Sequence, residues 1–316
     1  MNLSNRENTG ENPMDPPVIQ MLADIQSRIR KIEKKLVEIE KISTAPRAVP
    51  IIEGEKILVK LAQGDAFLIV ESNDRLIGPH LIMNGVYEKG LTTYLLRSVE
   101  KNSTFIDIGA NIGYYTCLLG KKLRDSGRIF AFEADPKNHS ILKRNMQINW
   151  IDKSNIIAEN VGISDKKCEL TFYRMINKPG NSSFIPQDTD SINTEMLKLN
   201  CTSIDDYFSS IPGSIDFMKI DVEGAEFSVL LGGQRTLGRQ NDIKIILEWD
   251  PARWTKASVS VKNVRDLLES LGFIPHTLDS KGEVSLSSWD EITKIRYANL
   301  IFSRTPIMKI GEHKTT

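Results

Sequence analysis

Residues 105–115 read Phe-Ile-Asp-Ile-Gly-Ala-Asn-Ile-Gly-Tyr-Tyr, and this stretch decides the fold. Its apolar start predicts a buried strand, its two glycines predict a turn, and the residues that follow predict a helix. Gly109 can adopt backbone angles that other residues avoid, so a ligand can approach the main chain there. Gly113 lets the start of the helix pack closely, and a helix N-terminus exposes unpaired N–H groups. We therefore expect a ligand site at the carboxyl end of this strand.

An acidic residue follows the next apolar run of the chain. Residues 128–132 read Arg-Ile-Phe-Ala-Phe, and Glu133 follows directly. A carboxylate at the tip of a neighbouring strand can accept hydrogen bonds from two ribose hydroxyls, which is what an adenosine-containing cofactor needs. A glycine-rich turn without a ligand is the simpler alternative, and Glu133 argues against it.

The charge beside the turn distinguishes between adenosine cofactors. A dinucleotide site favours G-x-G-x-x-G, but position 111 is Asn. Asp107 stands two residues before the first glycine, where a carboxylate would repel a diphosphate. It suits the positive charges of S-adenosylmethionine, namely the ammonium and the sulfonium. We therefore expect S-adenosylmethionine, and a nicotinamide-dependent oxidoreductase is disfavoured.

Three segments together carry a family resemblance. They are residues 107–116 (Asp-Ile-Gly-Ala-Asn-Ile-Gly-Tyr-Tyr-Thr), 131–136 (Ala-Phe-Glu-Ala-Asp-Pro) and 218–226 (Met-Lys-Ile-Asp-Val-Glu-Gly-Ala-Glu). The chain resembles the FkbM-type methyltransferases over roughly residues 80–303, and the third segment is the most specific. One departure is Ala134, where the family usually has proline. The resemblance implies a class I methyltransferase that methylates hydroxyl groups of sugars, glycans or polyketides with S-adenosylmethionine.

Composition excludes several classes of protein. The 316 residues hold 41 basic and 41 acidic side chains, so nothing suggests binding to nucleic acid or to an anionic membrane. The three cysteines are widely spaced and the four histidines are not paired, which argues against disulfides and zinc. No apolar run approaches the roughly 20 residues that span a bilayer, and the N-terminus has no signal-peptide core. We expect a cytoplasmic protein.

The chain divides into four parts. Residues 1–17 are rich in Asn, Glu and Pro and are expected to be disordered. Residues 18–43 predict a coiled-coil helix, and residues 44–50 predict a linker. Residues 51–316 form the expected methyltransferase domain, which includes a β-rich lead-in at 51–102. The resemblance implies that this lead-in covers the cofactor pocket.

Heptad spacing within residues 18–42 predicts self-association. The apolar residues are 4 and 3 apart in turn, at Val18, Leu22, Ile25, Ile29, Ile32, Leu36 and Ile39. In a parallel assembly, Arg28 would face Glu33 and Lys35 would face Glu40, both attractive pairs. Leucine at a with isoleucine at d favours trimers or tetramers over dimers. The alternative is an amphipathic helix that folds back on the catalytic domain.

Alternating apolar runs and helical patterns predict a Rossmann-like, doubly wound α/β fold beyond residue 103. We expect a seven-stranded sheet with strands at about 104–108, 128–132, 155–159, 216–221, 243–248, 273–278 and 296–303. Helices are expected at about 113–123, 137–148, 224–231 and 260–271. The last two strands predict an antiparallel end to the sheet, as in class I methyltransferases.

Five charged residues gather at the ends of two of these strands. Asp221 ends one strand and is the first candidate for the general base, with Lys219 as a neutral amine as the alternative. Glu248 ends the next strand and is a candidate substrate or metal ligand. Glu223 and Glu226 are candidate acceptor contacts, or they favour the helix N-terminus electrostatically. Magnesium bound by Asp221, Glu223 and Glu248 is a further possibility.

The remaining candidates rest on the resemblance. Glu88 is expected at the methionine end of the cofactor, or as a helix cap. Asp165 is expected at the adenine, next to residues 160–162, or as the start of a turn. The whole expected cofactor set is Glu88, Asp107, Gly109, Asn111, Gly113, Tyr115, Glu133, Ala134, Gly162 and Asp165.

A polar loop from Asn177 to Thr194 is the expected acceptor loop. Its Asn181 and Ser182 suit a hydroxylated small molecule or glycan, and an ordinary surface loop is equally compatible. The leading hypothesis is therefore an O-methyltransferase that assembles through residues 18–42. A non-catalytic coiled-coil scaffold in a glycan-synthesis complex is the alternative, and N-methylation stays open.

Overall fold

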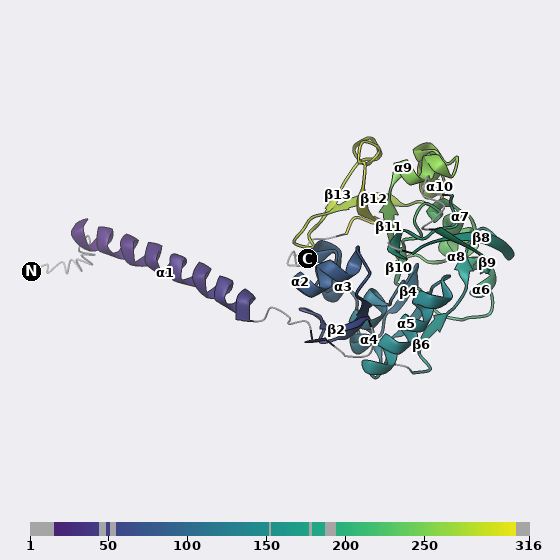
Figure 1. Ribbon diagram of the computed structural model, residues 1–316. Helices are drawn as coiled ribbons and strands as arrows, with labels where there is room; N and C mark the ends of the chain where they lie inside the picture. The colour runs from purple at the N-terminus through teal and green to yellow at the C-terminus, as the bar shows by residue number, and fades with distance from the viewer. Residues whose placement is uncertain are drawn as a thin grey trace, which may run out of the picture. The chain divides into compact units, whose positions relative to one another are not determined.

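The computed structural model describes residues 16–43, 49–50, 55–151, 153–176, 179–186 and 194–307. The chain forms two compact units, Met1–Ala45 and Pro46–Thr316 (Figure 1). Within the first unit, helix α1 spans Pro16–Ser43, so the helix starts two residues earlier than expected. The rest of the predicted tail, most of the predicted linker and residues 51–54 lie outside the described residues.

The second unit is built on one sheet of eight strands in the order β13-β12-β14-β11-β10-β4-β5-β6 (Figure 1). Strands β4, β5, β6, β10 and β11 run parallel, and β14 pairs antiparallel with β11. All seven expected strands are present, which confirms the doubly wound α/β class. Their bounds are β4 Thr104–Ile108, β5 Arg128–Phe132, β6 Ile156–Glu159, β10 Phe217–Ile220, β11 Lys244–Trp249, β12 Ile274–Leu278 and β14 Ala298–Ser303.

The expected count of seven was one too low. Strand β13 (Val284–Leu286) pairs antiparallel with β12 at the sheet edge. Only its first residue is buried, so its three residues carry too short an apolar pattern to predict a strand.

Each face of the sheet packs against its own hydrophobic core. Phe105 and Ile106 are both fully buried, yet they belong to different cores because successive side chains of a strand point to opposite faces. Helices α3 (Lys89–Ser98), α4 (Tyr114–Leu123) and α5 (Pro136–Ile148) contribute to the first core. The second core takes residues from α6 (Ile204–Tyr207), α7 (Glu226–Leu231), α8 (Gln234–Arg239), α9 (Pro251–Lys256), α10 (Val261–Ser270) and α11 (Trp289–Ile292).

The lead-in is β-rich, as expected, and it is fastened to the first core. Strands β1 (Val49–Pro50), β2 (Lys56–Lys60) and β3 (Phe67–Glu71) form an antiparallel sheet, followed by α2 (Ile77–Asn84). Residues 49–50 therefore begin the lead-in and do not belong to the predicted linker. Asn145 on α5 accepts the N–H of Ile69 at 2.7 Å and donates to the carbonyl of Ile112 at 2.8 Å. One buried amide thus ties the lead-in to the glycine turn.

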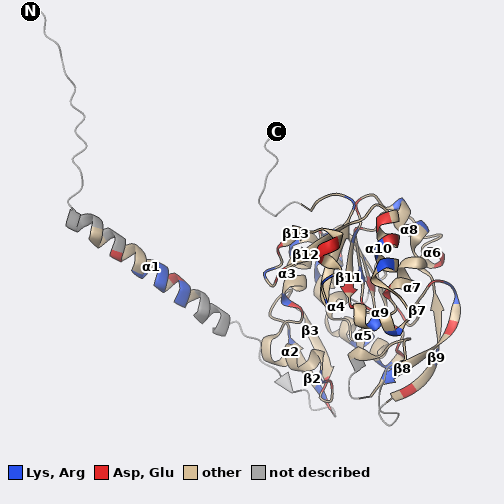
Figure 2. Cartoon of the chain, turned by 90° about the horizontal axis from the view of Figure 1, so that it is seen from above, with Lys and Arg blue, Asp and Glu red and all other residues tan. Residues whose placement is uncertain are grey.

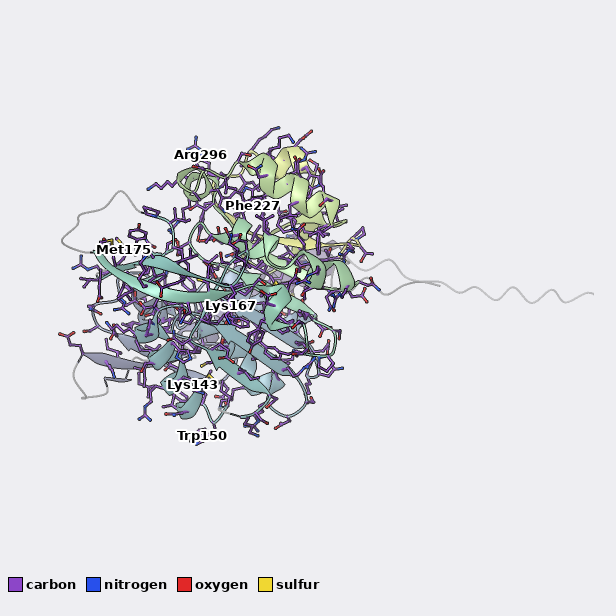
Figure 3. The ribbon with its side chains drawn as sticks, turned by 90° about the vertical axis from the view of Figure 1, so that its right-hand side faces the viewer. Lys143, Trp150, Lys167, Met175, Phe227 and Arg296 are labelled. Carbon is purple, nitrogen blue, oxygen red and sulfur yellow. The ribbon has the colours of Figure 1, made fainter. Side chains whose placement is uncertain are left out.

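The sequence pattern did not predict the third sheet, which consists of β7 (Gly162–Ile163), β8 (Cys168–Met175) and β9 (Thr194–Thr202). In Figure 3, Lys167 is the residue just before β8 and Met175 is the last residue of β8. Its strands are mostly half-exposed, so they lack the apolar runs by which the central strands were recognised. The described part of the expected acceptor loop, residues 179–186, follows β8.

Basic and acidic residues are interspersed along the described ribbon of the second unit (Figure 2). Within the described residues, no helix combines the length and the apolar character required to cross a membrane.

Candidate functional site

A cavity of about 400 Å³ lies at the carboxyl ends of the parallel strands. In the sheet, β4 lies between β5 and β10. The strands that follow β4 in sequence are added on its β5 side as far as β6, and the later strands β10 and β11 are added on its other side, so the strand order reverses between β4 and β10. Open α/β sheets bind ligands at such a switch point. His80 and Tyr87 of the lead-in line the cavity, which agrees with the expected covering role of that segment.

Gly109 brings the two strand ends together. Its φ is +81°, and a Cβ at this position would lie 1.8 Å from the backbone oxygen of Asp221. Only glycine therefore allows the turn to lie against the end of β10. Gly113 has φ +87° and begins α4, but it does not line the cavity. Its role is to let α4 pack against Leu142, which corrects the expectation of a direct cofactor contact.

Asp107 offers an unused acceptor to a cationic ligand. Its Oδ2 accepts a hydrogen bond from Thr116 at 2.7 Å, whereas its Oδ1 is buried and has no donor among the described residues. The side chain is only 1% exposed and lines the cavity. Burial raises the pKa of Asp107, and the Lys219 ammonium limits that rise. A buried acceptor without a donor is costly, so this site fits a positively charged or N–H-bearing group.

Glu133 is held in place by the backbone around it. Its Oε2 accepts the N–H of Asn111 at 2.7 Å, and its Oε1 accepts the N–H of Asp135 at 2.8 Å. Burial raises the pKa of Glu133 to about 7. The carboxylate lines the cavity at the end of β5, so its remaining lone pairs are available to hydroxyl donors.

The cavity lining also includes small and apolar residues, among them Ala134, Gly162, Phe172 and Phe184. A Cβ on Gly162 would lie 2.7 Å from a ring carbon of Phe184, so glycine keeps this wall flat. The expected adenine contact Asp165 is exposed and does not line the cavity; it pairs with Lys166. Asp165 therefore belongs to a surface turn, which corrects the expectation.

Glu88 also lies outside the cavity lining. It accepts hydrogen bonds from Tyr115 Oη at 2.6 Å and from Asn299 Nδ2 at 2.5 Å, and it makes no side-chain cap to α3. Burial raises the pKa of Glu88. Tyr115 lines the cavity and lies under the Lys219 ammonium, 5.1 Å from its ring centre. Glu88 therefore orients Tyr115 and occupies the N-cap position of α3 without a side-chain cap, and its expected contact with the cofactor stays a prediction.

Lys219 and Asp221 form a buried ion pair at the end of β10, the strand that pairs with the Asp107 strand β4. The Nζ–Oδ2 distance is 2.6 Å, and Lys219 is 3% exposed. Burial alone would lower the pKa of Lys219, but Asp221, Glu88 and Asp107 raise it above its ordinary value. These carboxylates favour the ammonium form of Lys219 over the neutral amine that its alternative role as a base requires.

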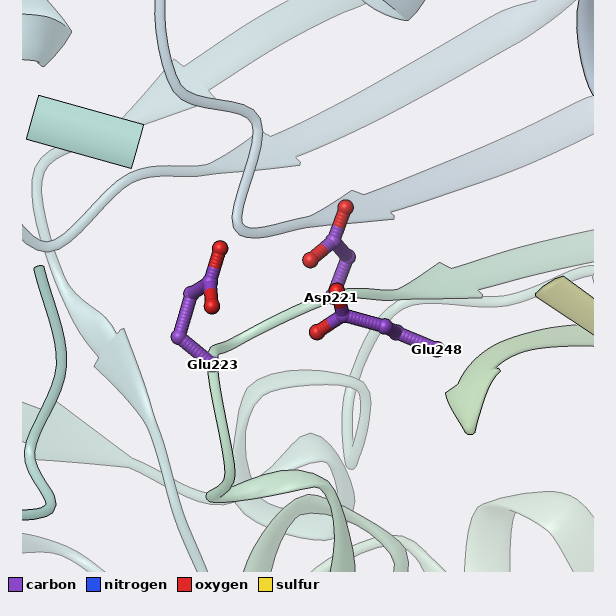
Figure 4. A group of neighbouring side chains, drawn as sticks. All are labelled: Asp221, Glu223 and Glu248. Atoms are coloured by element: carbon purple, nitrogen blue, oxygen red, sulfur yellow. The ribbon is translucent and has the colours of Figure 1, made fainter. Parts of the chain in front are cut away.

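Glu248 faces Asp221 from the end of β11. Its Oε1 accepts a hydrogen bond from Tyr297 at 3.0 Å, and its Oε2 is buried without a donor among the described residues. Burial and the carboxylates of Asp221 and Glu226 raise the pKa of Glu248 well above its ordinary value. Glu223 faces the same space, and one ligand oxygen from each of Asp221, Glu223 and Glu248 lies within 4.8 Å of the others (Figure 4).

Glu223 and Glu226 have different roles although they are three residues apart. Glu223 has φ +58°, lines the cavity and pairs with Arg253. Glu226 is fully buried outside the lining, and it accepts hydrogen bonds from two backbone N–H groups and from Trp254 Nε1 at 2.7 Å. Glu226 thus shapes the turn after β10, and this corrects its expected contact with the acceptor.

Asn181 and Ser182 line the cavity, as do residues that the sequence pattern did not single out. Asp250 directly follows the Glu248 strand, so its position was a usable signal for a strand-end residue. Nothing local marked the others, because distant segments bring them to the cavity. The lining residues missed by sequence reasoning include His80, Tyr87, Asn138, Phe172, Phe184, Asp250, Arg253 and Tyr297.

Comparisons with known proteins give a consistent result. The family model described as the methyltransferase FkbM domain matches residues 107–275, more than half of the chain. Methyltransferase 1 of Beauveria bassiana (strain ARSEF 2860) is 29% identical over 148 residues, and the match covers 42% of this chain and 58% of that protein. Methyltransferase sdnD of Sordaria araneosa is 26% identical over 207 residues, which cover 57% of this chain and 77% of that protein.

A solved structure is similar at lower identity. The methyltransferase FkbM of Methylobacillus flagellatus KT is 16% identical, with a TM-score of 0.41, and the match covers 67% of this chain and 47% of that one. The chain thus spans less than two thirds of this structure and of the Beauveria relative.

Proposed function

The chain belongs to the FkbM methyltransferase family, whose members use S-adenosylmethionine, and we propose that it methylates a hydroxyl group of a sugar, glycan or polyketide-like acceptor. The observation that carries the proposal is one cavity with two chemically different ends. Asp107 and Glu133 provide acceptors at one end, and Asp221 and Glu248 provide carboxylates at the other.

The first end suits the cofactor. When bound, S-adenosylmethionine would supply a methyl group on a positively charged sulfur. Asp107 Oδ1 would accept from the ammonium of the cofactor, and Glu133 would accept from its ribose hydroxyls. Ala134, Gly162 and Phe184 would enclose the adenine ring. Each buried acceptor would thereby gain a donor, which removes the cost of leaving it unpaired.

The second end suits a hydroxyl acceptor. Asp221 is the proposed general base, and Lys219 holds one of its oxygens. As the acceptor oxygen bonds to the methyl carbon, its proton passes to Asp221. The carbon–sulfur bond breaks with its electron pair left on sulfur, which yields S-adenosylhomocysteine. Alignment of oxygen, carbon and sulfur supplies much of the rate enhancement, and the rigid strand ends favour it.

Several polar groups support a polyhydroxylated acceptor. Asn181, Ser182 and Arg253 line the cavity, and Tyr297 reaches it beside Glu248. Their donors and acceptors suit an acceptor with many hydroxyl groups. A carboxylate beside the transfer site favours O-methylation, because a hydroxyl must lose its proton as it is methylated.

Cofactor binding tests the first half of the proposal. We expect purified protein to bind S-adenosylhomocysteine with micromolar affinity in a calorimetric titration, with NAD as the negative control. Asp107→Asn is expected to weaken binding at least 10-fold, because one lost charge-assisted hydrogen bond costs about 1.5–3 kcal/mol. Glu169→Gln, an exposed carboxylate on β8, is the matched control. No binding to the wild-type protein would contradict the methyltransferase proposal.

Methyl transfer tests the second half. Asp221→Asn is expected to lower kcat roughly 10²–10⁴-fold, the usual contribution of a positioned base, while affinity for S-adenosylhomocysteine stays within a few-fold. The measurement is S-adenosylhomocysteine formation with a panel of monosaccharides, nucleotide sugars and polyketide alcohols. An unchanged kcat in Asp221→Asn would show that Asp221 is not the general base. Cofactor binding without transfer to any member of the panel would favour the scaffold alternative.

The proposal includes a homo-oligomer and a cytoplasmic location. Four heptad residues of α1 are at least two-fifths exposed, namely Ile25 (41%), Ile29 (49%), Ile32 (57%) and Leu36 (58%). A continuous apolar seam on a helix is stabilised by burial against other helices, and this supports assembly through residues 18–42.

A further inference from the structure

We propose that Asp221, Glu223 and Glu248 bind a divalent cation, and that the cation binds two neighbouring oxygens of the acceptor, such as a vicinal diol. The cation site stands on its own geometry, whereas the diol rests on the proposed methyltransferase function. The three side chains come from the turn after β10 and from the end of β11, and each offers a ligand oxygen within 4.8 Å of the other two (Figure 4).

The strongest observation is the missing donor at Glu248. This residue is 95% buried and lines the cavity, and its Oε2 has no hydrogen-bond donor among the described residues. It faces the Asp221 carboxylate, which is also an acceptor. Two carboxylates that face each other in a buried site need a proton or a cation between them.

The net negative charge around the cluster matches the charge of a divalent cation. Four carboxylates line this end of the cavity, and two basic side chains balance half of their charge. Lys219 is already paired with Asp221, and Arg253 pairs with both Glu223 and Asp250. Glu248 contacts the neutral hydroxyl of Tyr297 and the carboxylate of Asp221, and it forms no ion pair among the described residues. A bound cation would neutralise the two formal charges that remain.

The chemistry of the ligands favours magnesium or manganese. Hard divalent ions prefer oxygen ligands and six positions, so three carboxylate oxygens leave positions for two acceptor oxygens and a water. A bound cation also lowers the pKa of a hydroxyl that it contacts. An acceptor with two adjacent oxygens would gain both orientation and acidity.

Manganese is the probe, because its electron paramagnetic resonance signal reports free and bound ion without any assay of activity. We expect the full-length wild-type protein to bind one Mn²⁺ per chain, and Mg²⁺ to displace it. Glu248→Gln and Glu223→Gln are each expected to weaken Mn²⁺ binding at least 10-fold. Glu169→Gln, which removes an exposed carboxylate on β8, is expected to leave the affinity unchanged. Because both Glu248→Gln and Glu223→Gln are measured, the test still stands if one of the two variants fails to fold.

The outcomes separate this inference from the proposed function. No saturable Mn²⁺ site in the wild type, or equal affinity in wild type and both variants, overturns the cation site. Calorimetry with S-adenosylhomocysteine on the same samples tests the function separately, since its failure beside intact Mn²⁺ binding contradicts only the methyltransferase proposal. If both ligands bind, chelation is expected to abolish transfer to vicinal diols and added Mg²⁺ to restore it. Transfer that is unaffected by chelation overturns the role in acceptor binding.

Discussion

Glu133 links the cofactor end of the cavity to the stability of the fold. Its two oxygens organise the turn after β4 and the start of α5 through the N–H groups of Asn111 and Asp135. Burial nevertheless raises its pKa from 4.5 to about 7, so the folded protein holds this proton more tightly than the unfolded chain does. Ionisation of Glu133, which is proposed to bind ribose, therefore lowers the stability of the folded protein.

The pH dependence of Glu133→Gln tests this cost. A group with a raised pKa contributes stability that is fully present below about pH 4.5 and is lost as the pH rises through about 7. Over that window, we expect the unfolding free energy of the wild type to fall by roughly 3 kcal/mol relative to Glu133→Gln. Urea denaturation of both proteins from about pH 5 to about pH 8 measures the difference. A constant difference would show that Glu133 does not titrate there.

At the scale of elements, an ion pair links the hairpin of β8 and β9 to the segment that follows β5. Arg174 on β8 donates to Asp135 through Nε at 2.8 Å and through Nη2 at 2.5 Å. Asp135 is 1% exposed and also caps α5 by accepting the N–H of Lys137. The pair thus connects the hairpin to the end of β5, where Glu133 lies. Phe172 of the same strand lines the cavity.

Arg174→Met is expected to lower the unfolding free energy by about 3 kcal/mol, because the carboxylate of Asp135 would stay buried without its cation. Affinity for S-adenosylhomocysteine should also fall, since the hairpin would lose its attachment beside the expected adenine position. Urea denaturation and calorimetry measure the two effects. Arg144→Met, an exposed arginine on α5, is the control and is expected to change stability by less than about 0.5 kcal/mol. Equal effects of the two substitutions would refute the attachment.

At the scale of the whole molecule, α1 and the second unit differ in where their apolar residues can be buried. The second unit buries its apolar residues in two cores around one sheet. Described apolar residues on α1 are exposed, and they repeat with heptad spacing. A helix of 28 residues with such a seam gains most of its stability from other helices. We therefore propose that assembly is a property of α1, whereas the cavity lies within the second unit.

The double variant Ile29→Asp/Ile32→Asp is expected to convert the protein to monomers, since it places charges in the seam. Sedimentation velocity at about 10 μM measures the change, and Ser27→Asp, outside the seam, should retain the wild-type mass. Methyl transfer per chain is expected to persist in the double variant. A monomeric wild type would contradict the coiled coil, and loss of transfer on dissociation would show that the active unit is an oligomer.

Much of the fold could be predicted because its signals are local. Apolar runs alternate with helical patterns, so the seven main strands and four of the helices were predicted to within a few residues. Short or half-exposed elements were missed, as β13 and β8 show, because they lack a strong apolar period. Among the candidate residues, Asp107, Glu133, Asp221 and Glu248 follow or end strands, so their meeting at one sheet edge was predictable.

The sequence by itself determined the doubly wound sheet and the strand-end carboxylates, because both follow from periodicity and from the glycine turn. Only the tertiary structure decided which side chains share the cavity. Glu223 reaches it and Glu226 does not, since the left-handed backbone at Glu223 and the Trp254 indole direct the two carboxylates differently. Glu88 is likewise directed to Tyr115 by packing. Such directions depend on contacts between residues far apart in the chain, which a local pattern does not contain.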